Sequence, residues 1–518
     1  MYFNAFETLF LKNGNFYGVP YNFFSDAPEN LQFICADDQN VDFYAAIITN
    51  LGLDCEVNSY CSFTPGGTFY TMTASNTFDS NNNGCDVTDI TLPNLKFNVT
   101  NGTQTGTFIV NQSGNYSIPV SSGTHTITPV LENPTYFNIS PASATVTFPD
   151  TTSPFSQNFC ITPNGINRDL EVTIIPINPS IPGFNANYKI VYRNIGNVNI
   201  AMGTVGLDYN DNTLDYVSSL PSTEVLPVGN LYWTFLNLQP FETRTIDVSF
   251  NLNSPTETPA LNSGDLLSFT ASVNTSVGDD VNTSNNVITL PQIVVNSFDP
   301  NDKTCLEGTS ITPDMIGKYV HYMIRFENTG TFAAQNIVVK DMIDQSKFDI
   351  SSLIPLNASH NFTTRIAGNK VEFIFENINL PFDDASNDGY IVFKIKTVPT
   401  LVLGDSFSNS ASIYFDYNFP IVTDPAVTTF AVLGNEDFEF SKYLTVYPNP
   451  VNDLLKITSK QNIELRSMEI YNMIGQLVIS VPNANGISSI DVSSLPKGNY
   501  FLKVVSDKGT SNVKFIKR

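Results

Sequence analysis

A short acidic segment early in the chain has the residue types and spacing of a calcium-binding loop. Carboxylate and amide oxygens recur around Gly84, and Ca²⁺ prefers hard oxygen ligands of this kind. The candidate ligands are Asp79, Asn81, Asn83, Asp86 and Asp89. The segment departs from an EF-hand, because Ile90 stands where the bidentate glutamate would be. A structural Ca²⁺ ion and a metal-free turn of Asn and Gly both stay open as interpretations, and no other cofactor is indicated.

The cysteines suggest a second kind of chemistry, the formation of disulfides. The chain has 6 cysteines in an acidic background, most of them in its first third, which favours disulfides made in an oxidising compartment. No CxxC motif occurs, so a zinc site or a thioredoxin-like motif is not expected. Cys35 and Cys55 are the favoured pair, and the partners of Cys61, Cys85 and Cys160 are undecided. Buried free thiols are the alternative, with Cys305 the first candidate.

Residues that could carry out catalysis are sparse. The 3 histidines fall in separate β-rich stretches, and the sequence has no HExxH, GxSxG, GxxxxGK[ST] or GxGxxG motif. We therefore predict that the protein is not an enzyme.

Charge divides the chain into two parts. The whole carries 49 acidic and 25 basic residues, a net charge of −24 that would repel nucleic acid or an anionic membrane. Residues 442–518 instead hold 10 basic and 5 acidic residues, which marks the tail as a separate module. No run of 18 apolar residues occurs, so no transmembrane segment is expected.

The elements that must position these residues are mostly short β-strands bounded by Gly, Pro, Asn and Ser. This pattern predicts a mostly β fold, a chain of antiparallel β-sandwich domains behind a short N-terminal segment. The domains we predict are residues 1–60, 61–163, 164–297, 298–432 and a linker with a tail domain at 433–518.

The N-terminal segment carries a weak repeat. Leu9 and Leu11 recur as Leu31 and Phe33, a displacement of 22 residues that lies in the leucine-rich-repeat range. Residues 41–52 have apolar positions three and four apart and end at a glycine, which predicts an amphipathic helix. Residues 1–60 resemble the end of a leucine-rich-repeat solenoid and its capping helix.

The next three segments are predicted to be sandwiches. Residues 61–163 resemble the B-type repeats of bacterial surface adhesins, which are prealbumin-like sandwiches. The strand of Tyr188, Tyr192 and Asn194 recurs 134 residues later, and later anchors such as Trp233 and Phe373 recur at an offset of 140. This duplication, with period-two strands and an Asn-x-Gly turn, predicts two immunoglobulin-like domains at 164–297 and 298–432.

The tail has the most specific motifs in the chain. YPNP follows its first predicted strand, MEIYN precedes a glycine, and PKGNYFLKV comes before a closing VKF. In this order the motifs resemble the type A C-terminal sorting domain of the type IX secretion system of Bacteroidetes. The residues that carry the resemblance are Tyr447, Pro448, Asn449, Pro450, Gly475, Gly498, Tyr500 and Lys514.

This resemblance implies a secreted or cell-surface protein that the type IX machinery exports, with an unknown extracellular protein or glycan as its ligand. Because the opening residues lack the features of a signal peptide, we expect that peptide to be missing from this sequence. We predict a noncatalytic modular protein that acts in adhesion or ligand binding through leucine-rich repeats. The alternative is a set of accessory and export modules of a secreted hydrolase whose catalytic domain lies upstream of Met1.

Overall fold

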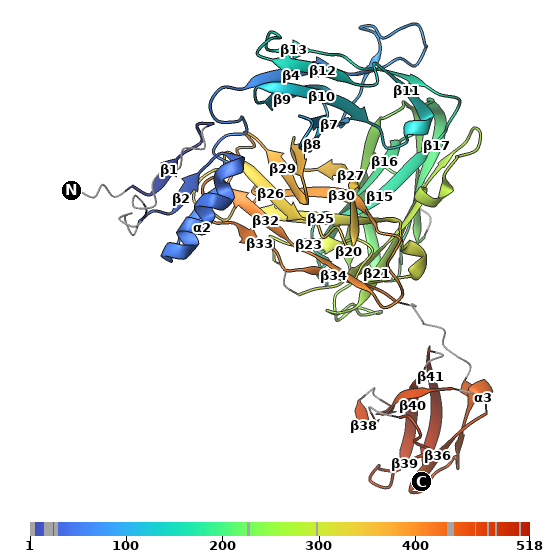
Figure 1. The fold of residues 1–518 in the computed structure, drawn as a ribbon. Coiled ribbons are helices and arrows are strands. Elements are labelled where there is room, and N and C mark those ends of the chain that lie inside the picture. The colour runs from blue at the N-terminus through green and yellow to red at the C-terminus, as the bar shows by residue number, and fades with distance from the viewer. Residues whose placement is uncertain are drawn as a thin grey trace. The chain divides into compact units, whose positions relative to one another are not determined.

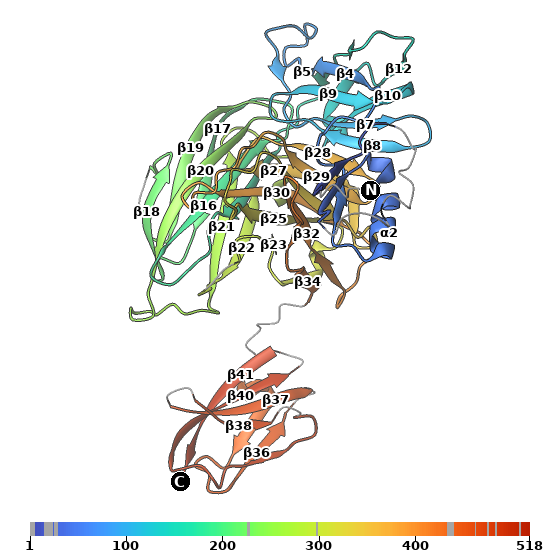
Figure 2. The same cartoon turned by 90° about the vertical axis from the view of Figure 1, so that its left-hand side faces the viewer.

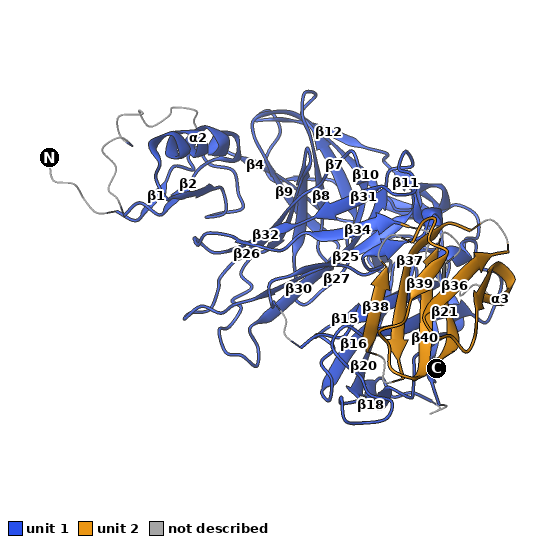
Figure 3. Ribbon diagram, turned by 90° about the horizontal axis from the view of Figure 1, so that it is seen from below, with its two compact units in different colours: residues 1–430 blue, residues 431–518 orange. Residues whose placement is uncertain are grey.

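The chain forms two compact units, residues 1–430 and 431–518, which Figure 3 colours separately. Figures 1 and 2 show a computed structural model of the protein from two directions. The structure describes residues 6–14, 24, 30–224, 228–296, 299–431, 440–460, 463–473, 476–481, 484–506 and 509–518. The fold is mostly β, as the sequence predicts, and the boundary between the units lies close to the predicted start of the tail module at residue 433.

The N-terminal segment is a small parallel sheet with a helix beside it. Its strands are β1 (Thr8–Phe10), β2 (Phe33–Cys35) and β3 (Glu56–Asn58), paired in parallel. The predicted helix is confirmed as α2 (Val41–Leu51), which ends at Gly52 in the left-handed conformation. The predicted repeat spacing of 22 residues is wrong, because Leu9 pairs with Ile34, 25 residues on, and not with Leu31.

The predicted disulfide between Cys35 and Cys55 is also wrong. Cys35 is bonded to Cys61, with Cα atoms 6.0 Å apart, and Cys85 is bonded to Cys160. Cys35 lies level with Asn58 at the end of β3, and the chain turns there and brings Cys61 back toward it. Cys55 precedes the start of β3, about 10 Å along the strand, and is a free thiol.

Residues 61–163 form short sheets around one apolar core. Alternation along the strands places apolar side chains inward, as in β9, whose buried residues occupy every second position. The strands are β4 (Tyr70–Ser75), β5 (Thr77–Phe78), β6 (Ile90–Thr91), β7 (Lys96–Thr100), β8 (Thr105–Ile109), β9 (Asn115–Val120), β10 (Gly123–Val130), β11 (Phe137–Ser140), β12 (Ala144–Phe148), β13 (Phe155–Ser156) and β14 (Cys160–Pro163).

The first of the duplicated domains, hereafter the first copy, consists of two four-stranded sheets. One sheet has the order β15-β16-β20-β18 and the other the order β19-β17-β21-β22. The strands are β15 (Leu170–Pro176), β16 (Asn185–Asn194), β17 (Ile200–Asp208), β18 (Leu214–Leu220), β19 (Asn230–Leu238), β20 (Thr243–Leu252), β21 (Leu266–Thr275) and β22 (Val287–Ile293).

The second copy repeats the same pairings with a divided second sheet. Its first sheet has the order β23-β25-β30-β27, and β24, β34 and β31 form a separate small sheet. The strands are β23 (Lys303–Cys305), β24 (Ser310–Ile311), β25 (Tyr319–Glu327), β26 (Ile337–Met342), β27 (Phe348–Ala358), β28 (Thr363–Ala367), β29 (Lys370–Phe375), β30 (Asp388–Thr397), β31 (Ser406–Asn409), β32 (Ala411–Phe415), β33 (Ile421–Val422) and β34 (Ala426–Phe430).

The Asn-x-Gly turn expected in both copies has the same hydrogen bonds in each. The Asn194 amide donates to the carbonyls of Val198 and Leu238, and its side-chain oxygen accepts from the N–H of Gly196. In the second copy, Asn328 makes the equivalent three bonds, donating to the carbonyls of Phe332 and Leu380 and accepting from Gly330. The turn therefore satisfies backbone groups that the strand end would otherwise leave buried and unpaired.

The 61–163 segment and both copies belong to one compact unit. Strand β8 of the 61–163 segment pairs antiparallel with β28 of the second copy, from Thr364 opposite Ile109 to Ala367 opposite Gly106. This joins both segments in one nine-stranded sheet, and Figure 2 shows β8 beside β28 and β29. Edge strands expose unpaired backbone groups, and here two such edges complete each other.

The C-terminal unit is a small sandwich with its own core. A three-stranded sheet and a four-stranded sheet enclose apolar residues such as Leu455, Met468, Leu502 and Phe515. Its elements are α3 (Phe440–Tyr443), β35 (Leu444–Tyr447), β36 (Leu454–Ser459), β37 (Leu465–Asn472), β38 (Leu477–Val481), β39 (Ser489–Asp491), β40 (Gly498–Ser506) and β41 (Gly509–Lys517). Among the described residues, no helix is long and apolar enough to cross a membrane.

Candidate functional site

The YPNP turn of the C-terminal unit is tied to the last strand of the chain. The side-chain oxygen of Asn449 accepts from the N–H of Ile516 at 2.9 Å, and its amide donates to the carbonyl of Lys514 at 3.3 Å. The next backbone groups continue this contact, because the N–H of Val451 donates to the carbonyl of Ile516 at 2.8 Å. The two prolines fix φ on either side of this asparagine, so the turn holds both ends of the unit together.

Strand β40 presents alternate residues to the core, as the sequence predicts. Tyr500, Leu502 and Val504 are buried, whereas the Lys503 amine lies 3.7 Å from the carboxylate of Glu469 near the surface. The Tyr500 ring stacks on Phe515, with ring centroids 5.7 Å apart, and its hydroxyl donates to the carbonyl of Pro496. The alternation of Tyr500, Leu502 and Val504 with more exposed residues in this motif is therefore that of a core strand.

The remaining sorting-motif residues have different surroundings. Tyr447 and Pro448 begin the turn, Gly498 begins β40, and Lys514 is exposed on β41. Gly475 lies outside the described residues. The structure thus brings the YPNP turn and β41 together, and the charged group of Lys514 is exposed to solvent.

In the predicted calcium loop, three acidic side chains hydrogen-bond to backbone N–H groups of the loop itself. The Asp79 carboxylate accepts from the N–H groups of Asn83 and Gly84, at 3.2 and 2.8 Å. Asp86 accepts from the backbone and hydroxyl of Thr88, and these bonds lower the pKa of Asp86. The Asp89 carboxylate accepts from the N–H of Asp86.

Within the described part of the chain, no three acidic, histidine or cysteine side chains lie close enough together to hold a metal ion. Asn81 caps the N–H of Asn83 at 3.0 Å, as in a metal-free turn. Calcium binding by Asp79, Asn81, Asn83, Asp86 and Asp89 stays a prediction.

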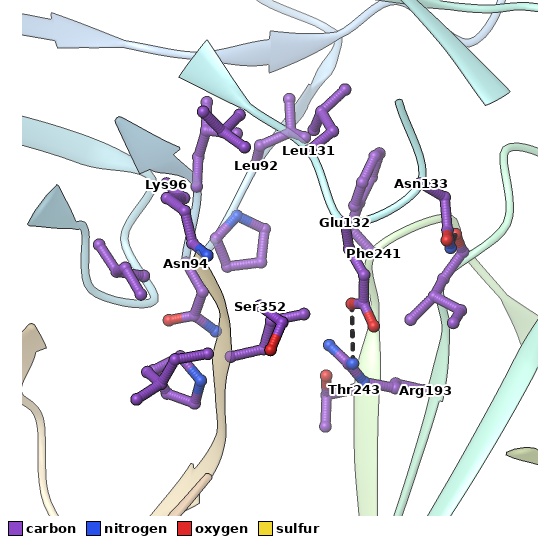
Figure 4. Close-up of a pocket in the computed structure, with 18 of the residues that line it drawn as sticks. Leu92, Asn94, Lys96, Leu131, Glu132, Asn133, Arg193, Phe241, Thr243 and Ser352 are labelled. Carbon is purple, nitrogen blue, oxygen red and sulfur yellow. Dashed lines mark hydrogen bonds and ion pairs between the residues drawn. The ribbon is translucent and has the colours of Figure 1, made fainter. Parts of the chain in front are cut away.

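A cavity of about 290 Å³ lies where the 61–163 segment meets both copies. Its walls include Leu92 and Leu131 from the 61–163 segment (Figure 4). Phe241 from the first copy and Ser352 from the second copy also line it. Lys96 also lines it and donates to the carbonyl of Ser351, and burial lowers the pKa of this amine to about 8.

Four charged side chains beside the cavity join the three segments. Arg193 contacts Glu132 at 2.9 Å and Glu171 at 2.5 Å, and Figure 4 marks the first of these contacts with a dashed line. Lys394 contacts the same two carboxylates, lying 2.6 Å from Glu132 and also bonding to Glu171. We call these four residues the junction network.

The junction network is electrically balanced, with two carboxylates and two cations. Burial alone would raise the pKa of Glu171, but Arg193 and Lys394 hold it at about 2. A carboxylate that two cations keep ionised has no proton to donate near neutral pH and is a weak base. The arrangement therefore holds domains together and does not resemble an active site.

The junction network could not be predicted from the sequence, because its members lie far apart. Glu132 and Lys394 are separated by 262 positions, and each stands in a strand or loop with no local motif. The only available signal was the rarity of basic residues in residues 1–441, which makes each strand lysine or arginine a candidate for a buried pair.

Comparison with known protein families assigns two segments of the chain. Residues 299–429, within the second copy, match a family described as a domain of unknown function, DUF7619. Residues 445–518 match the family described as the secretion system C-terminal sorting domain. A search of curated proteins found no significant match.

Several solved structures align with the chain at low similarity. They include the CARDB domain of a Pyrococcus furiosus protein, with 20% identity over 25% of this chain and 90% of that one, and a TM-score of 0.19. The C-terminal domain of the Streptococcus pyogenes antigen I/II-family protein AspA aligns with 10% identity over 51% and 100%, with a TM-score of 0.18. The major pilin subunit BcpA of Bacillus cereus aligns with 12% identity over 71% and 97%, with a TM-score of 0.19. At these TM-scores the alignments support no conclusion about this chain.

The family match over the tail agrees with its folded unit. The matched span begins inside β35 and runs to the last residue, so it covers both sheets and the YPNP turn that Asn449 ties to β41. The C-terminal unit is a secretion system C-terminal sorting domain, which makes this chain a secreted or cell-surface protein.

Proposed function

We propose that this chain is a noncatalytic adhesion or ligand-binding protein that the type IX secretion system exports through residues 433–518. The observation that carries the proposal is the sorting domain, which matches its family over residues 445–518 and has a core of its own. An export signal that folds independently can be recognised whatever cargo precedes it, and it can be removed without exposing the core of that cargo.

The first unit has the properties of a rigid carrier. The shared nine-stranded sheet and the junction network prevent its segments from moving independently of one another. The N-terminal segment is fixed to the second copy as well, since the Tyr60 hydroxyl donates to Glu372 at 2.8 Å and Arg365 bonds to Asp38 at 3.1 Å. Such a body would hold a binding surface at a set position outside the cell.

The three stacked parallel strands of residues 8–58 support the assignment of that binding surface to leucine-rich repeats. Parallel strands spaced about one repeat apart, with a helix in one connection, are what the end of a solenoid requires. In this proposal the ligand is an extracellular protein or glycan that contacts this end of the chain.

Export can be tested by fusing residues 433–518, behind a signal peptide, to a fluorescent cargo in a Bacteroidetes host with the type IX system. We expect the cargo in the medium or on the cell surface, and in the periplasm when Asn449→Ala releases the YPNP turn from β41. A cargo that stays in the periplasm with the unaltered tail, while an established sorting domain delivers the same cargo, would refute the proposal.

A further inference from the structure

Three polar side chains meet in the otherwise apolar core of the second copy. Lys303 and Asp341 have side chains that are 0% exposed, and they are bonded to each other. The Asn409 amide donates to the same Asp341 oxygen, Oδ2, at 3.3 Å. We call Lys303, Asp341 and Asn409 the buried triad.

The buried triad links three different sheets. Lys303 lies on β23, the first strand of the domain, Asp341 on β26 in the nine-stranded sheet, and Asn409 on β31 in the small sheet. Aromatic rings surround the amine, whose Nζ lies 4.8 Å from the ring centroid of Tyr322 and 5.5 Å from that of Phe393.

Polar atoms beside the triad lack partners. Within the described residues, neither Asp341 Oδ1 nor the Tyr322 hydroxyl has a hydrogen-bond partner. A buried polar group without a partner costs about 1–3 kcal/mol, so a core selected for stability alone would not contain this group of atoms.

The first copy shows what the same fold places at these positions. Lys303 pairs with Ile324 on β25, and Ile174 pairs with Ile190 on β16. Ile190 and Ile324 are anchors of the 134-residue repeat. Ile174 is therefore the counterpart of Lys303, and it is fully buried.

The same reasoning gives a counterpart for the acid. Asp341 pairs with Ala411 on β32, and Leu207 pairs with Ala271 on β21. The two alanines are anchors of the 140-residue offset, so Leu207 is the counterpart of Asp341.

Asn409 lies two residues before Ala411, as Phe269 lies two residues before Ala271. The first copy thus has Ile, Leu and Phe at the three positions, all in its apolar core. Burying an ion pair where apolar residues suffice is commonly neutral or destabilising, so the fold itself does not require the triad.

We propose that Lys303 and Asn409 become joined by an intramolecular amide bond, with Asp341 as the catalytic residue that moves the protons. The neutral Lys303 amine attacks Cγ of Asn409. The bond from Cγ to Nδ2 then breaks as protonated Asp341 gives its proton to the departing nitrogen, which leaves as ammonia, and the Asp341 carboxylate takes the proton that the Lys303 nitrogen loses. One C–N bond forms and one breaks, so no oxidant, reductant or cofactor is needed.

The surroundings suit each step. Burial lowers the pKa of Lys303 and raises that of Asp341, which favours a neutral amine and a protonated acid at the start of the reaction. Asp341 Oδ2 bonds to both the attacking and the leaving nitrogen, so one group reaches both sites of proton transfer. Exclusion of water prevents hydrolysis from competing with amide formation.

The product would be a covalent clamp between β23 and β31. These strands lie near the two ends of the second copy, so a pull on the domain would be carried by an amide bond and not by strand pairing alone. This gives an exported carrier protein a means of resisting mechanical load and proteases.

The decisive measurement is the intact mass of the full chain after disulfide reduction and denaturation. We expect a mass lower than the sequence requires by one ammonia. The full sequence mass would overturn the proposal, as would the loss of one water, which would show condensation of Lys303 with Asp341 itself. Because this measurement uses the unaltered protein, it does not depend on a variant that folds.

Peptide mapping locates the bond. Trypsin should leave the chain uncut after Lys303 and give a branched peptide that contains Asn409. It should cut after Lys394, an equally buried lysine whose contacts are the carboxylates of Glu132 and Glu171. A linear peptide ending at Lys303 would contradict the assignment.

Two variants test the roles of the partners. Asp341→Leu and Asn409→Phe each introduce the residue that the first copy has at that position. Because Asp341→Leu leaves the buried Lys303 without its carboxylate, circular dichroism first establishes that each variant folds. Each should have its full sequence mass. An ammonia loss that persists in Asn409→Phe would overturn the choice of Asn409, and one that persists in Asp341→Leu would overturn the catalytic role of Asp341.

Discussion

The two copies share a fold and an Asn-x-Gly turn, yet they differ in the chemistry of their cores. The first copy is closed by apolar packing alone at the positions where the second has Lys303, Asp341 and Asn409. Duplication therefore supplies an internal reference for this protein, since the first copy shows that the fold does not need these polar residues. The second copy differs by a group able to react, placed where water does not reach it.

The first prediction concerns the lysine of the buried triad. Lys303→Met leaves the buried Asp341 side chain without the hydrogen bond to the Lys303 nitrogen, at a cost of about 1–3 kcal/mol. Loss of a cross-link closing a loop of about 100 residues would add about 4–5 kcal/mol. Ile174→Met in the first copy conserves volume and should cost less than about 1.5 kcal/mol. Urea unfolding of the full chain, followed by tryptophan and tyrosine fluorescence, would compare the two variants. Equal shifts in the midpoint would show that Lys303 contributes no more to stability than Ile174 does.

A triple variant tests the same point in the opposite direction. K303I/D341L/N409F gives the second copy the first copy's residues at these positions, and it should fold and be more stable than Lys303→Met. Failure of the triple variant to fold, measured by circular dichroism, would show that the two cores are not equivalent.

The second prediction concerns the contact between the copies. Lys394→Met leaves Glu171 of the first copy with only Arg193, and we expect a loss of about 3–5 kcal/mol in the free energy of unfolding. Lys189→Met removes a matched strand lysine whose partner, Asp247, is half exposed, and it should cost less than about 1 kcal/mol. A loss of similar size in both variants would mean that the junction network does not bind the copies together.

The pH dependence of stability gives a third test, because two buried acids of the first copy titrate in opposite directions. The pKa of Glu171 is about 2 in the folded protein, below its ordinary value of 4.5. Its contribution is therefore present above about pH 4.5 and is lost as the pH falls toward 2, by about 3 kcal/mol in total.

Asp169 behaves in the opposite way, since burial raises its pKa to about 6. The folded state binds its proton first, so stability should rise as the pH falls from about 6 toward 4. Together these acids predict a maximum near pH 4 in urea midpoints measured from pH 2 to 7. Asp169→Asn should remove the upper slope and Lys394→Met should weaken the lower one. Slopes unchanged in both variants would contradict the assignments.

Features that depend on residues close together in the sequence could be predicted, and contacts between residues far apart in the sequence could not. The Asn-x-Gly turn and the alternation of Tyr500, Leu502 and Val504 are local patterns, and the structure confirms both. The pairing of β8 with β28 joins residues more than 250 positions apart, and no local pattern marks either strand as the partner of the other. The Cys35–Cys61 bond was missed for a related reason, because the turn after β3 determines which cysteine returns to Cys35.

The buried triad was equally hidden, although the repeat contained a usable signal. Aligning the copies by their anchors puts a lysine, an aspartate and an asparagine opposite isoleucine, leucine and phenylalanine. Core packing does not explain polar residues at positions that are apolar in the other copy, so a chemical role for them is the remaining explanation. The sequence offset alone does not identify the counterpart of β23. The strand pairing of the structure is needed to align Lys303 with Ile174.

The smallest expected effect tests whether the copies are equivalent where they look identical. Asn194→Ala and Asn328→Ala each remove three hydrogen bonds and take one donor from each of two backbone carbonyls. Each should cost about 1–3 kcal/mol in the free energy of unfolding, because these groups are buried. The two sites share no hydrogen-bond partner, so the losses should add in the double variant to within about 0.5 kcal/mol. Unequal single losses would show that one turn has a stabilising contact that the other lacks. The second copy has such a contact, because the Asn387 amide donates to the Asn328 backbone carbonyl at 3.2 Å. A larger loss for Asn194→Ala would therefore assign that support to Asn387, and Asn387→Ala should then make the two turns equally sensitive.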